Sequence, residues 1–410
     1  MARRKGSVNQ TTRYLEQSGG NPDISTLVGC LVLDAVDAGA SDIHIEPWES
    51  SVAVRIRLNG VLSELAHLPL DFMERISGRL KVMADLISYE TDLPQEGRAP
   101  ADPALGGVEL RISVFPTVRG EKIVIRIFDP RNRSFKLDDL GFDNHSMEQF
   151  VKLLARPSGL LLLTGPTGSG KTTAMYSALY HLTEKNGPGI SISTVEDPVE
   201  FNLPMISQSQ VKRAKEYTYP MALRSLMRQD PEVIMIGEIR DGETAGIAVQ
   251  AGLTGHLVIS TIHSGSTAGV FARLINMEIE PFLIASSLVG VMGLRLIRTN
   301  CPHCAEPYQP EPGLLASLPK EVVDIAQFRK GVGCAVCHNT GFGKRTSLTE
   351  MLILDEVLRD AILQKIPTRK LQEIAINQGM RTLFQSGMER VIHGQTTVEE
   401  VLRMVAMDQF

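Results

Sequence analysis

The stretch LLLLTGPTGSGKTTAMYSALYHL, residues 160–182, decides the fold of this chain. Its first four residues, Leu160–Leu163, are uniformly apolar, which predicts a strand buried on both faces of a parallel sheet. Met175, Leu179 and Leu182 then recur at helical spacing. The sequence therefore predicts a strand that leads through a glycine-rich loop into a helix.

The loop of this unit matches the pattern G-x-x-x-x-G-K-[ST] without a gap. Its glycines let backbone N–H groups turn inward around an anion, and the helix adds the positive end of its dipole. Lys171 is expected to reach the β- and γ-phosphates of ATP, and the Thr172 hydroxyl to bind Mg²⁺. A glycine-rich turn that matches by chance is the alternative, which the flanking strand and helix disfavour. The predicted nucleotide-binding residues are Gly165, Pro166, Thr167, Gly168, Ser169, Gly170, Lys171, Thr172 and Thr173.

The composition is that of an ordinary globular protein, with 43% apolar and 22% charged residues in a chain of 410. This length predicts two or three domains. The net charge of −5 gives no global basic field that would attract nucleic acid, so no nucleic-acid partner is expected. The sequence shows neither a membrane-spanning apolar run nor a signal peptide, and five cysteines do not suggest a disulfide scaffold, so a cytoplasmic location is expected.

Periodicity and breaks divide the chain into four parts. We expect a disordered basic tail at 1–23, a small α/β domain at 24–130, a linker at 131–145 and a nucleotide domain at 146–410. The last includes a cysteine-bearing insert at 296–345 and C-terminal helices at 346–410. In the small domain, stretches such as SVAVRIRL and EKIVIRIF alternate like half-exposed strands, and Asn59-Gly60 predicts a hairpin turn. The expected strands of the nucleotide domain are Leu160–Leu163, Ile190–Val195, Val233–Ile236 and Leu257–Ser260.

Acidic residues follow two of these expected strands. In an open parallel sheet, ligands bind beyond the carboxyl ends of the strands. ATP hydrolysis needs one carboxylate to orient or deprotonate water and another to hold Mg²⁺. Glu238 follows a four-residue apolar run and is favoured as the first, whereas Glu196 and Glu200 follow the other strand; solvated loop acids are the alternative. Because Gly237 stands where a magnesium-binding Asp is usual, Mg²⁺ would be held mainly by Thr172, phosphate and water, with help from Glu196.

Two histidines, His256 and His263, bracket the expected strand Leu257–Ser260. A lone histidine is more often a structural residue. A pair placed around a strand next to the nucleotide favours phosphate sensing or coupling between subunits.

Four cysteines form two C-x₂-C pairs, CPHC and CAVC. Thiolates at this spacing can grip one tetrahedral Zn²⁺, and two pairs complete its shell. A redox pair is the competing interpretation. A closed four-ligand site leaves no position for catalysis, so the zinc would be structural. The predicted ligands are Cys301, Cys304, Cys334 and Cys337.

These motifs, in this order, resemble the secretion ATPase superfamily, whose general secretory pathway E branch drives type II secretion and type IV pilus assembly. The matching stretches include LTGPTGSGKTT, STVEDPVEF, GEIRDGETAGIAVQAGLTGHLVISTIHS, ASDIHIEP, RIRLNG and LPQEGR, and they cover residues 40 to 300 almost continuously. The resemblance implies a RecA-like P-loop core with a parallel-rich sheet, preceded by a small PAS-like α/β domain. It also implies a ring homo-hexamer that hydrolyses ATP at subunit interfaces and acts on an inner-membrane platform protein, as a cytoplasmic motor peripheral to that membrane.

The resemblance also assigns roles to residues. The Gly237-Glu238 pair is the family's form of the magnesium strand, with Glu238 as the catalytic glutamate. Family members complete the site with arginines of the small domain, and guanidinium groups stabilise charge on the transferring phosphoryl group; arginine on an exposed sheet face is the other interpretation. The implied catalytic residues are Glu238, Lys171, the acidic-box residues Glu196 and Glu200, and Arg57, Arg98 and Arg111, with His256 and His263 as the histidine box.

Three further expectations concern the kind of ATPase. By resemblance, the four-cysteine insert marks the assembly and export branch, because pilus retraction ATPases lack it. Only about 24 residues precede the small domain, where members of the secretion branch carry a larger docking domain, which suggests a compact plasmid, conjugative-pilus or minor pilus type. The alternative functions are a nucleic-acid translocase or conjugation-type ATPase on the same core, and a regulatory scaffold that binds ATP without hydrolysing it.

Overall fold

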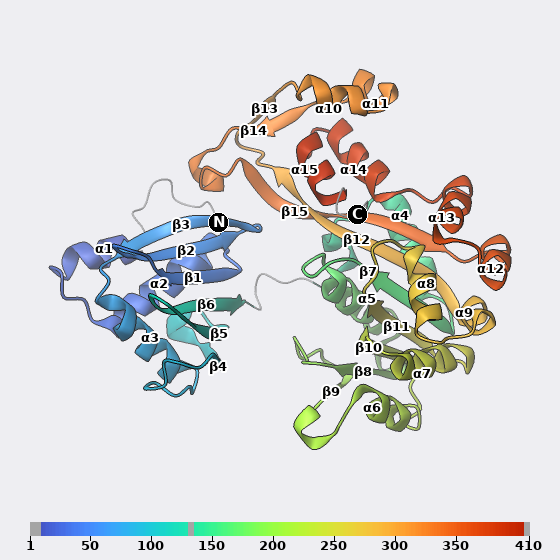
Figure 1. The fold of residues 1–410 in the computed structure, drawn as a ribbon, viewed down its shortest axis with the longest axis horizontal. Helices are drawn as coiled ribbons and strands as arrows, with labels where there is room; N and C mark the ends of the chain where they lie inside the picture. The colour runs from blue at the N-terminus through green and yellow to red at the C-terminus, as the bar shows by residue number, and fades with distance from the viewer. Residues whose placement is uncertain (1–9, 130–134, 406–410) are drawn as a thin grey trace. The chain divides into compact units, whose positions relative to one another are not determined.

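The computed structural model describes residues 10–129 and 135–405, and these fall into two compact units (Figure 1). The first unit contains residues 10–129 together with the cysteine-bearing segments 301–304 and 331–343. The second contains residues 135–300, 305–330 and 344–405. Residues 1–9 of the expected tail, residues 131–134 of the expected linker and the last five residues lie outside the described part of the chain.

The first unit is built on a six-stranded antiparallel sheet with the strand order β3-β2-β1-β6-β5-β4. The expected hairpin is confirmed: β2 and β3 are joined through Asn59 and Gly60, both at positive φ, as a tight hairpin turn requires. The strands are β1 Asp42–Pro47, β2 Val52–Leu58, β3 Val61–Leu68, β4 Gln95–Asp102, β5 Val108–Thr117 and β6 Gly120–Phe128.

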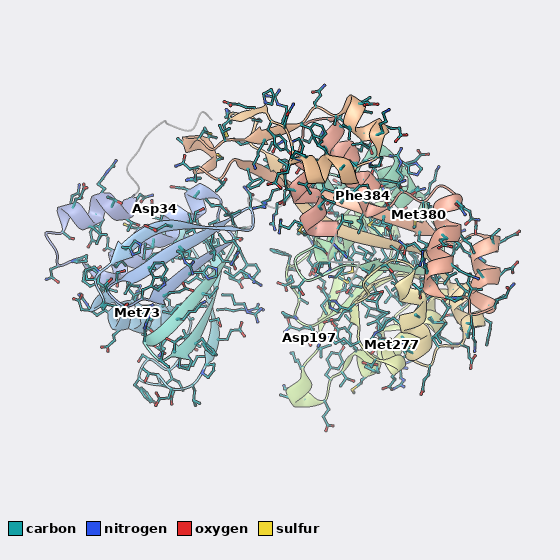
Figure 2. The ribbon with its side chains drawn as sticks, turned by 45° about the horizontal axis from the view of Figure 1, so that its top comes forward. Asp34, Met73, Asp197, Met277, Met380 and Phe384 are labelled. Carbon is teal, nitrogen blue, oxygen red and sulfur yellow. The ribbon has the colours of Figure 1, made fainter. Side chains whose placement is uncertain are left out.

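Helices cover one face of this sheet. Helices α2 (Ile24–Ala38) and α3 (Phe72–Met83) bury apolar side chains against alternate residues of the strands, such as Ile43 and Ile45. Helix α1 (Gln10–Gln17) lies within the expected disordered tail, yet it is ordered on α2 because Asp34 accepts hydrogen bonds from its first two amides, at 2.8 and 2.9 Å (Figure 2). The opposite face of the sheet is left to polar side chains.

The second unit is built on a seven-stranded sheet with the order β15-β12-β7-β11-β10-β8-β9, parallel from β12 to β9. Four of its strands confirm the predicted apolar runs, namely β7 Gly159–Thr164, β8 Ile192–Glu196, β10 Val233–Ile239 and β11 Leu257–Ile262. The other three are β9 Ser207–Gln210, β12 Leu288–Asn300 and β15 Phe342–Ile353. The predicted start of the cysteine insert, residue 296, therefore falls inside β12.

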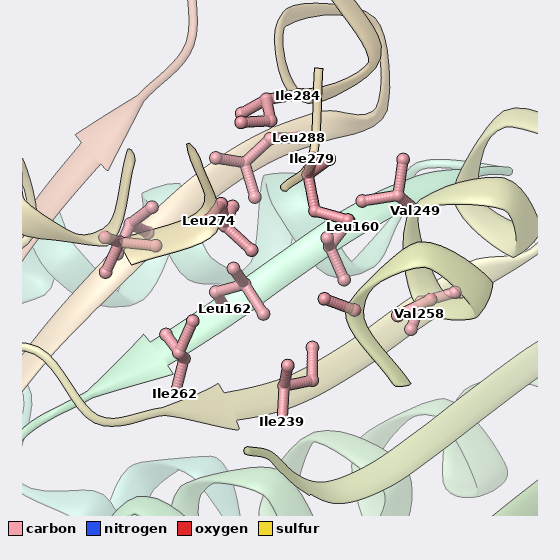
Figure 3. Packing of buried hydrophobic residues seen from close by; sticks show 14 of the residues in the cluster. Leu160, Leu162, Ile239, Val249, Val258, Ile262, Leu274, Ile279, Ile284 and Leu288 are labelled. Carbon is pink, nitrogen blue, oxygen red and sulfur yellow. The ribbon is translucent and has the colours of Figure 1, made fainter. Parts of the chain in front are cut away.

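Both faces of β7 are buried, as its apolar run predicted. Leu160 and Leu162 pack in a cluster with helices α7 (Gly242–Leu253), α8 (Gly269–Asn276) and α9 (Pro281–Ser287) (Figure 3). Leu161 and Leu163 pack on the other side with α4 (Asn144–Leu154) and α5 (Lys171–Asn186). Each of these leucines is fully buried, so the carboxyl end of β7 is a rigid mount for the loop that follows it.

The remaining elements surround this core. The expected C-terminal helices are confirmed as α12 Glu356–Leu363, α13 Thr368–Asn377, α14 Leu383–Ile392 and α15 Val398–Val405. Helix α6 is Tyr219–Leu226, and the region between β12 and β15 carries β13 Ala305–Pro307, α10 Pro312–Ser317, α11 Lys320–Ile325, β14 Arg329–Gly331 and the single turn η6 Ala335–Cys337. Single turns also occur at η1 Pro103–Leu105, η3 Leu137–Leu140, η4 Gly187–Gly189 and η5 Arg213–Lys215. Among the described residues, no helix has the length and apolar character that crossing a bilayer requires.

Candidate nucleotide site

The phosphate loop, residues 165–172, joins the carboxyl end of β7 to the first turn of α5. Gly165 has φ 148°, and a Cβ added there would lie 2.5 Å from the carbonyl oxygen of Leu294 on β12. Only glycine fits that position. Gly170 caps α5 in the left-handed conformation, so the N-terminus of α5 opens directly into the loop.

The side chains of the loop fit the binding of phosphate. Lys171 Nζ donates to the carbonyl oxygens of Gly165 and Pro166, at 2.7 and 2.9 Å, so the ammonium group folds back over the loop. The Ser169 side chain is buried, and its hydroxyl has no hydrogen-bond partner among the described residues. Thr167, Thr172 and Thr173 are exposed. The arrangement offers an anion a helix terminus, a lysine and an unpaired hydroxyl donor.

Electrostatics in the loop favour an anion as well. Burial lowers the pKa of Lys171, the Arg295 guanidinium lowers it further, and the Glu238 carboxylate opposes both. Arg295 is itself buried on β12, and its Nη1 atom would lie 3.0 Å from a Cβ at Gly165. Sequence reasoning missed Arg295, since it falls in a long apolar strand with no motif around it.

Glu238 lies near the carboxyl end of β10, two strands away from β7 in the sheet. Its side chain is 17% exposed and forms an ion pair with Arg240, and the His263 Nε2 atom lies 3.7 Å from Glu238 Oε2. The His263 loop is tied in turn to the end of β7, because Thr164 Oγ1 donates to the Ser264 carbonyl at 3.0 Å and accepts from its amide at 3.1 Å. Thus Glu238 and His263 share one edge of the sheet with the phosphate loop.

Steric contacts explain why glycine occupies position 237, where a magnesium-binding Asp is usual. A Cβ at this position would lie 2.8 Å from the Tyr219 hydroxyl oxygen and 3.5 Å from Glu196 Cα. Thr261 Oγ1 also holds the Gly237 carbonyl, at 2.9 Å. An aspartate on β10 therefore has no room here, and the tyrosine hydroxyl occupies the place beside Glu238.

The two candidates of the acidic box differ in exposure. Glu196 is 3% exposed, and its carboxylate accepts bonds from Tyr176, Thr194 and Gln208. Glu200 is exposed, and its amide donates to the Tyr176 hydroxyl at 3.2 Å. Glu196 is the last residue of β8, and Glu200 belongs to the chain that follows it, where Figure 2 labels Asp197. Of these two carboxylates, only that of Glu200 is open to solvent.

The structure separates the two predicted histidines. His263 follows β11 at the edge that carries the phosphate loop, but His256 precedes β11 and accepts the Gly159 amide at the other end of β7. A six-residue strand spans about 20 Å. The His256 ring also has a local partner, because its Nδ1 atom lies 3.1 Å from the Ala251 carbonyl. Within one chain, His256 does not belong to the site around Glu238.

The predicted arginines stand in one row across the antiparallel sheet of the first unit. The strand register pairs Arg57 with Asp42, Asp42 with Arg126, Arg126 with Arg111, and Arg111 with Arg98. Register partners share a face of a sheet, so these residues form one arginine row with a single acid within it. Arg126, which sequence reasoning missed, joins the row through its Nε atom, 3.2 Å from Asp42 Oδ1.

Each predicted arginine of the row also has an acidic neighbour. Arg57 Nε lies 3.8 Å from Asp42 Oδ2, and Arg111 Nε donates to Glu96 at 2.8 Å. Arg98 Nη1 lies 3.8 Å from Glu109. The pairs of Arg98 and Arg111 are exposed to solvent and therefore weak, whereas Arg57 shares the buried Asp42 carboxylate with Arg126.

The four cysteine sulfurs gather in one cluster within 4.8 Å of one another. The sulfurs of Cys301 and Cys334 lie 3.9 Å apart, as do those of Cys304 and Cys337. Four sulfurs at about 2.3 Å from a tetrahedral Zn²⁺ would lie about 3.8 Å apart. Burial raises the pKa of Cys337, but amide donors from Cys334 and Gly341, together with the side chains of Cys334 and Cys304, outweigh it and bring that pKa to about 7. The donor set and its spacing fit one metal ion.

A parallel sheet whose phosphate loop and catalytic-type glutamate share its carboxyl edge defines a P-loop nucleotide-binding protein. The chain belongs to the type II/IV secretion system protein family, which it matches over residues 17–403. This finding confirms the family predicted from the sequence.

Two relatives and one solved structure agree with that assignment. The chain is 41% identical over 401 residues to the type IV pilus assembly ATPase PilB of Myxococcus xanthus, covering 97% of this chain and 70% of that protein. It is 38% identical over 397 residues to the type II secretion system protein E of Pseudomonas aeruginosa, covering 97% and 78%. The X-ray structure of the Legionella pneumophila ATPase DotB has the same fold, with a TM-score of 0.68, 19% identity and coverage of 93% and 95%. The predicted fold class is confirmed, as is the predicted class of secretion and pilus-assembly ATPases.

Proposed function

We propose that this chain hydrolyses Mg²⁺-bound ATP to drive type II secretion or type IV pilus assembly. The observation that carries the proposal is the placement of Glu238, with His263 Nε2 3.7 Å from its carboxylate, at the carboxyl edge of the sheet that also carries the phosphate loop. A carboxylate beside a bound triphosphate can orient and deprotonate the attacking water. The proposal that hydrolysis drives secretion or pilus assembly rests on the names of the relatives.

Each residue of the site then has a distinct task. Backbone amides of the phosphate loop and the dipole of α5 bind the β-phosphate, while Lys171 turns from the loop carbonyls to the γ-phosphate. Thr172 is the hydroxyl ligand available to Mg²⁺, which when bound neutralises charge on the phosphate oxygens. His263 lies against Glu238 and fits a role in sensing the γ-phosphate.

We further propose that the arginine row completes the site of a neighbouring subunit in a homo-hexamer. Arg57, Arg98, Arg111 and Arg126 present guanidinium groups on one face of the sheet, and such groups stabilise the transferring phosphoryl group. The family assignment supports a cytoplasmic assembly peripheral to the inner membrane, acting on a platform protein there. The cysteine cluster would hold structural Zn²⁺.

Steady-state release of phosphate from ATP tests the hydrolysis. The wild-type chain should release phosphate only when Mg²⁺ is present, and Glu238→Gln should lower the rate by about 10²–10⁴-fold while ATP binding persists. Glu232→Gln is the matched control, because Glu232 precedes the same strand at its opposite end and bonds to the Ser191 amide. Equal rates in wild type and Glu238→Gln would remove Glu238 from the mechanism.

A further inference from the structure

The Tyr176 hydroxyl connects the helix that carries Lys171 to the chain that follows β8. Tyr176 lies on α5, five residues after Lys171, and is fully buried. Its hydroxyl donates to Glu196 Oε2 and accepts the amides of Glu200 and Phe201, at 3.2 and 3.4 Å. One side-chain group thereby binds Glu196, which directly precedes the acidic segment (residues 197–201), and the last two residues of that segment.

The other oxygen of Glu196 is engaged as well. Glu196 Oε1 accepts from Thr194 Oγ1 at 2.6 Å and from Gln208 Nε2 at 3.0 Å. Gln208 also donates to the Phe201 carbonyl at 2.9 Å, which ties β9 to the same segment. With three donors from α5, β8 and β9, and 3% exposure, the carboxylate is satisfied by protein groups.

The ring of Tyr176 is held in place independently of its hydroxyl. Phe135 and Phe201 pack edge-on against it, with ring centroids 5.5 and 6.1 Å away. Burial and the Glu196 carboxylate raise the pKa of Tyr176, so the hydroxyl stays protonated and continues to donate at neutral pH. Replacement by phenylalanine would thus remove one hydroxyl and leave the packing of the ring in place.

We propose that Tyr176 is a positioning residue for ATP hydrolysis, and that Glu196 acts through Tyr176 rather than as a ligand of Mg²⁺. Lys171, Thr172 and Tyr176 share one helix, so this hydroxyl fixes the distance between the phosphate loop and the acidic segment that bears Asp197 and Glu200. The inference rests on the proposed hydrolysis of ATP, and because protein donors engage both oxygens of Glu196, it leaves Mg²⁺ to other ligands.

Tyr176→Phe tests the proposal. We expect kcat to fall by about 10- to 100-fold with KM for ATP changed less than twofold, because a displaced group costs turnover more than binding. A fluorescent ATP analogue should still bind, but Mg²⁺ should tighten its binding less than in the wild type. Tyr180→Phe is the matched control, since Tyr180 pairs with Glu184 on the same helix and should behave as wild type. An unchanged kcat and an unchanged Mg²⁺ effect in Tyr176→Phe would overturn the proposal.

The variant Glu196→Gln separates positioning from metal binding. If Glu196 acts through Tyr176, the double variant Tyr176→Phe/Glu196→Gln is no slower than the slower single variant. Losses that multiply would show that Glu196 acts independently of Tyr176, and would overturn that part of the proposal. Thermal unfolding of each variant checks the fold, and if Tyr176→Phe unfolds, Glu196→Gln alone must reproduce the weakened Mg²⁺ effect. A wild type that binds the analogue without hydrolysing it would refute the proposed function, and the Mg²⁺ effect on binding would still decide the inference.

Discussion

The two large sheets of this protein carry their candidate functional residues in different places. In the parallel sheet of the second unit both faces are buried, and Lys171, Glu238 and His263 lie in or near the segments beyond its carboxyl edge. In the antiparallel sheet of the first unit α2 and α3 cover one face, and the arginine row crosses the other face through paired strand positions. Chemistry at an edge depends on loop geometry, whereas chemistry on a face depends on strand register.

Among the further variants that compare the edge with the face, the largest effect is expected from Gly165→Ala at the edge. The added Cβ meets the Leu294 carbonyl at 2.5 Å, and φ of 148° disfavours an L-residue. The clash costs about 1–3 kcal/mol and the backbone about 1–2 kcal/mol, so a fluorescent ATP analogue should bind about 10²-fold more weakly. Gly168→Ala is the control, because Gly168 has a positive φ but open space around it. Equal losses in the two variants would show that strain, not the close approach, limits the loop.

On the face, Arg126→Ala should lower kcat by about 10- to 100-fold, because the remaining arginines of the row share the task. ATP binding by the isolated subunit should not change. Arg119→Ala is the control, since Arg119 is exposed at the turn between β5 and β6, outside the row. The readout is phosphate release at saturating ATP.

Mixing two impaired variants then tells whether the row acts between subunits. Arg126→Ala retains Glu238, and Glu238→Gln retains Arg126. If the arginine serves a neighbour's site, mixed assemblies contain some complete sites and regain activity. If mixing yields only the average of the two separate rates, the row does not act in trans. The face of the antiparallel sheet would then not complete the nucleotide site at the edge of a neighbour's parallel sheet.

The sequence predicted the site residues at the edge of the parallel sheet more completely than those on the face of the antiparallel sheet, for a physical reason. The phosphate loop, the strand before it and Glu238 are local patterns, and each can be read within about ten residues. Arg126 sits in the alternating stretch EKIVIRIF, which places it on the polar face, but its membership in the row depends on the pairing of β6 with β1 and β5. Register is a property of chain segments that are far apart in sequence.

The same distinction explains the histidines and the acidic box. His256 and His263 are close in sequence, yet a six-residue strand places them at opposite ends of β11, which the strand prediction itself could have shown. Both Glu196 and Glu238 lie near the end of an apolar run. The burial of Glu196, however, depends on Tyr176 and Gln208, which come from other elements. No local pattern in the sequence marks that network.

A chelator tests whether the cysteine cluster stabilises the fold alone or also supports nucleotide binding at the edge of the parallel sheet. Removal of the metal, or Cys304→Ser, should lower the midpoint of thermal unfolding by roughly 5–10 °C, since metal binding contributes to folding. Metal analysis should find one zinc per chain, and Cys30→Ser should change neither result because Cys30 lies outside the cluster. Binding of the ATP analogue should survive chelation below the unfolding temperature. Loss of binding there would mean that the cluster supports the edge of the parallel sheet directly.

The smallest effect is expected from Glu46, a charge on the same face as the arginine row but outside it. Burial raises the pKa of Glu46, yet its pairs with Lys122 and Arg55 outweigh burial and hold that pKa below the ordinary 4.5. A carboxyl with a lowered pKa stabilises the fold above about pH 4.5, and this contribution is lost as the pH falls through the lowered value. Glu46→Gln should therefore lower the free energy of unfolding by about 1 kcal/mol at pH 7 and by almost nothing at pH 3.

The exposed Glu49→Gln on the turn after β1 is the control for Glu46→Gln and should show no difference at either pH. Urea unfolding of the full chain at the two pH values gives the comparison, and kcat should stay at the wild-type level in Glu46→Gln. A loss of stability with an unchanged kcat would show two kinds of charge on this face. Glu46 would stabilise the sheet, whereas the arginine row would bind an anion. If Glu46→Gln instead lowers kcat as much as Arg126→Ala, the whole face acts as one electrostatic surface. A residue's contribution to kcat would then not depend on its place in the arginine row.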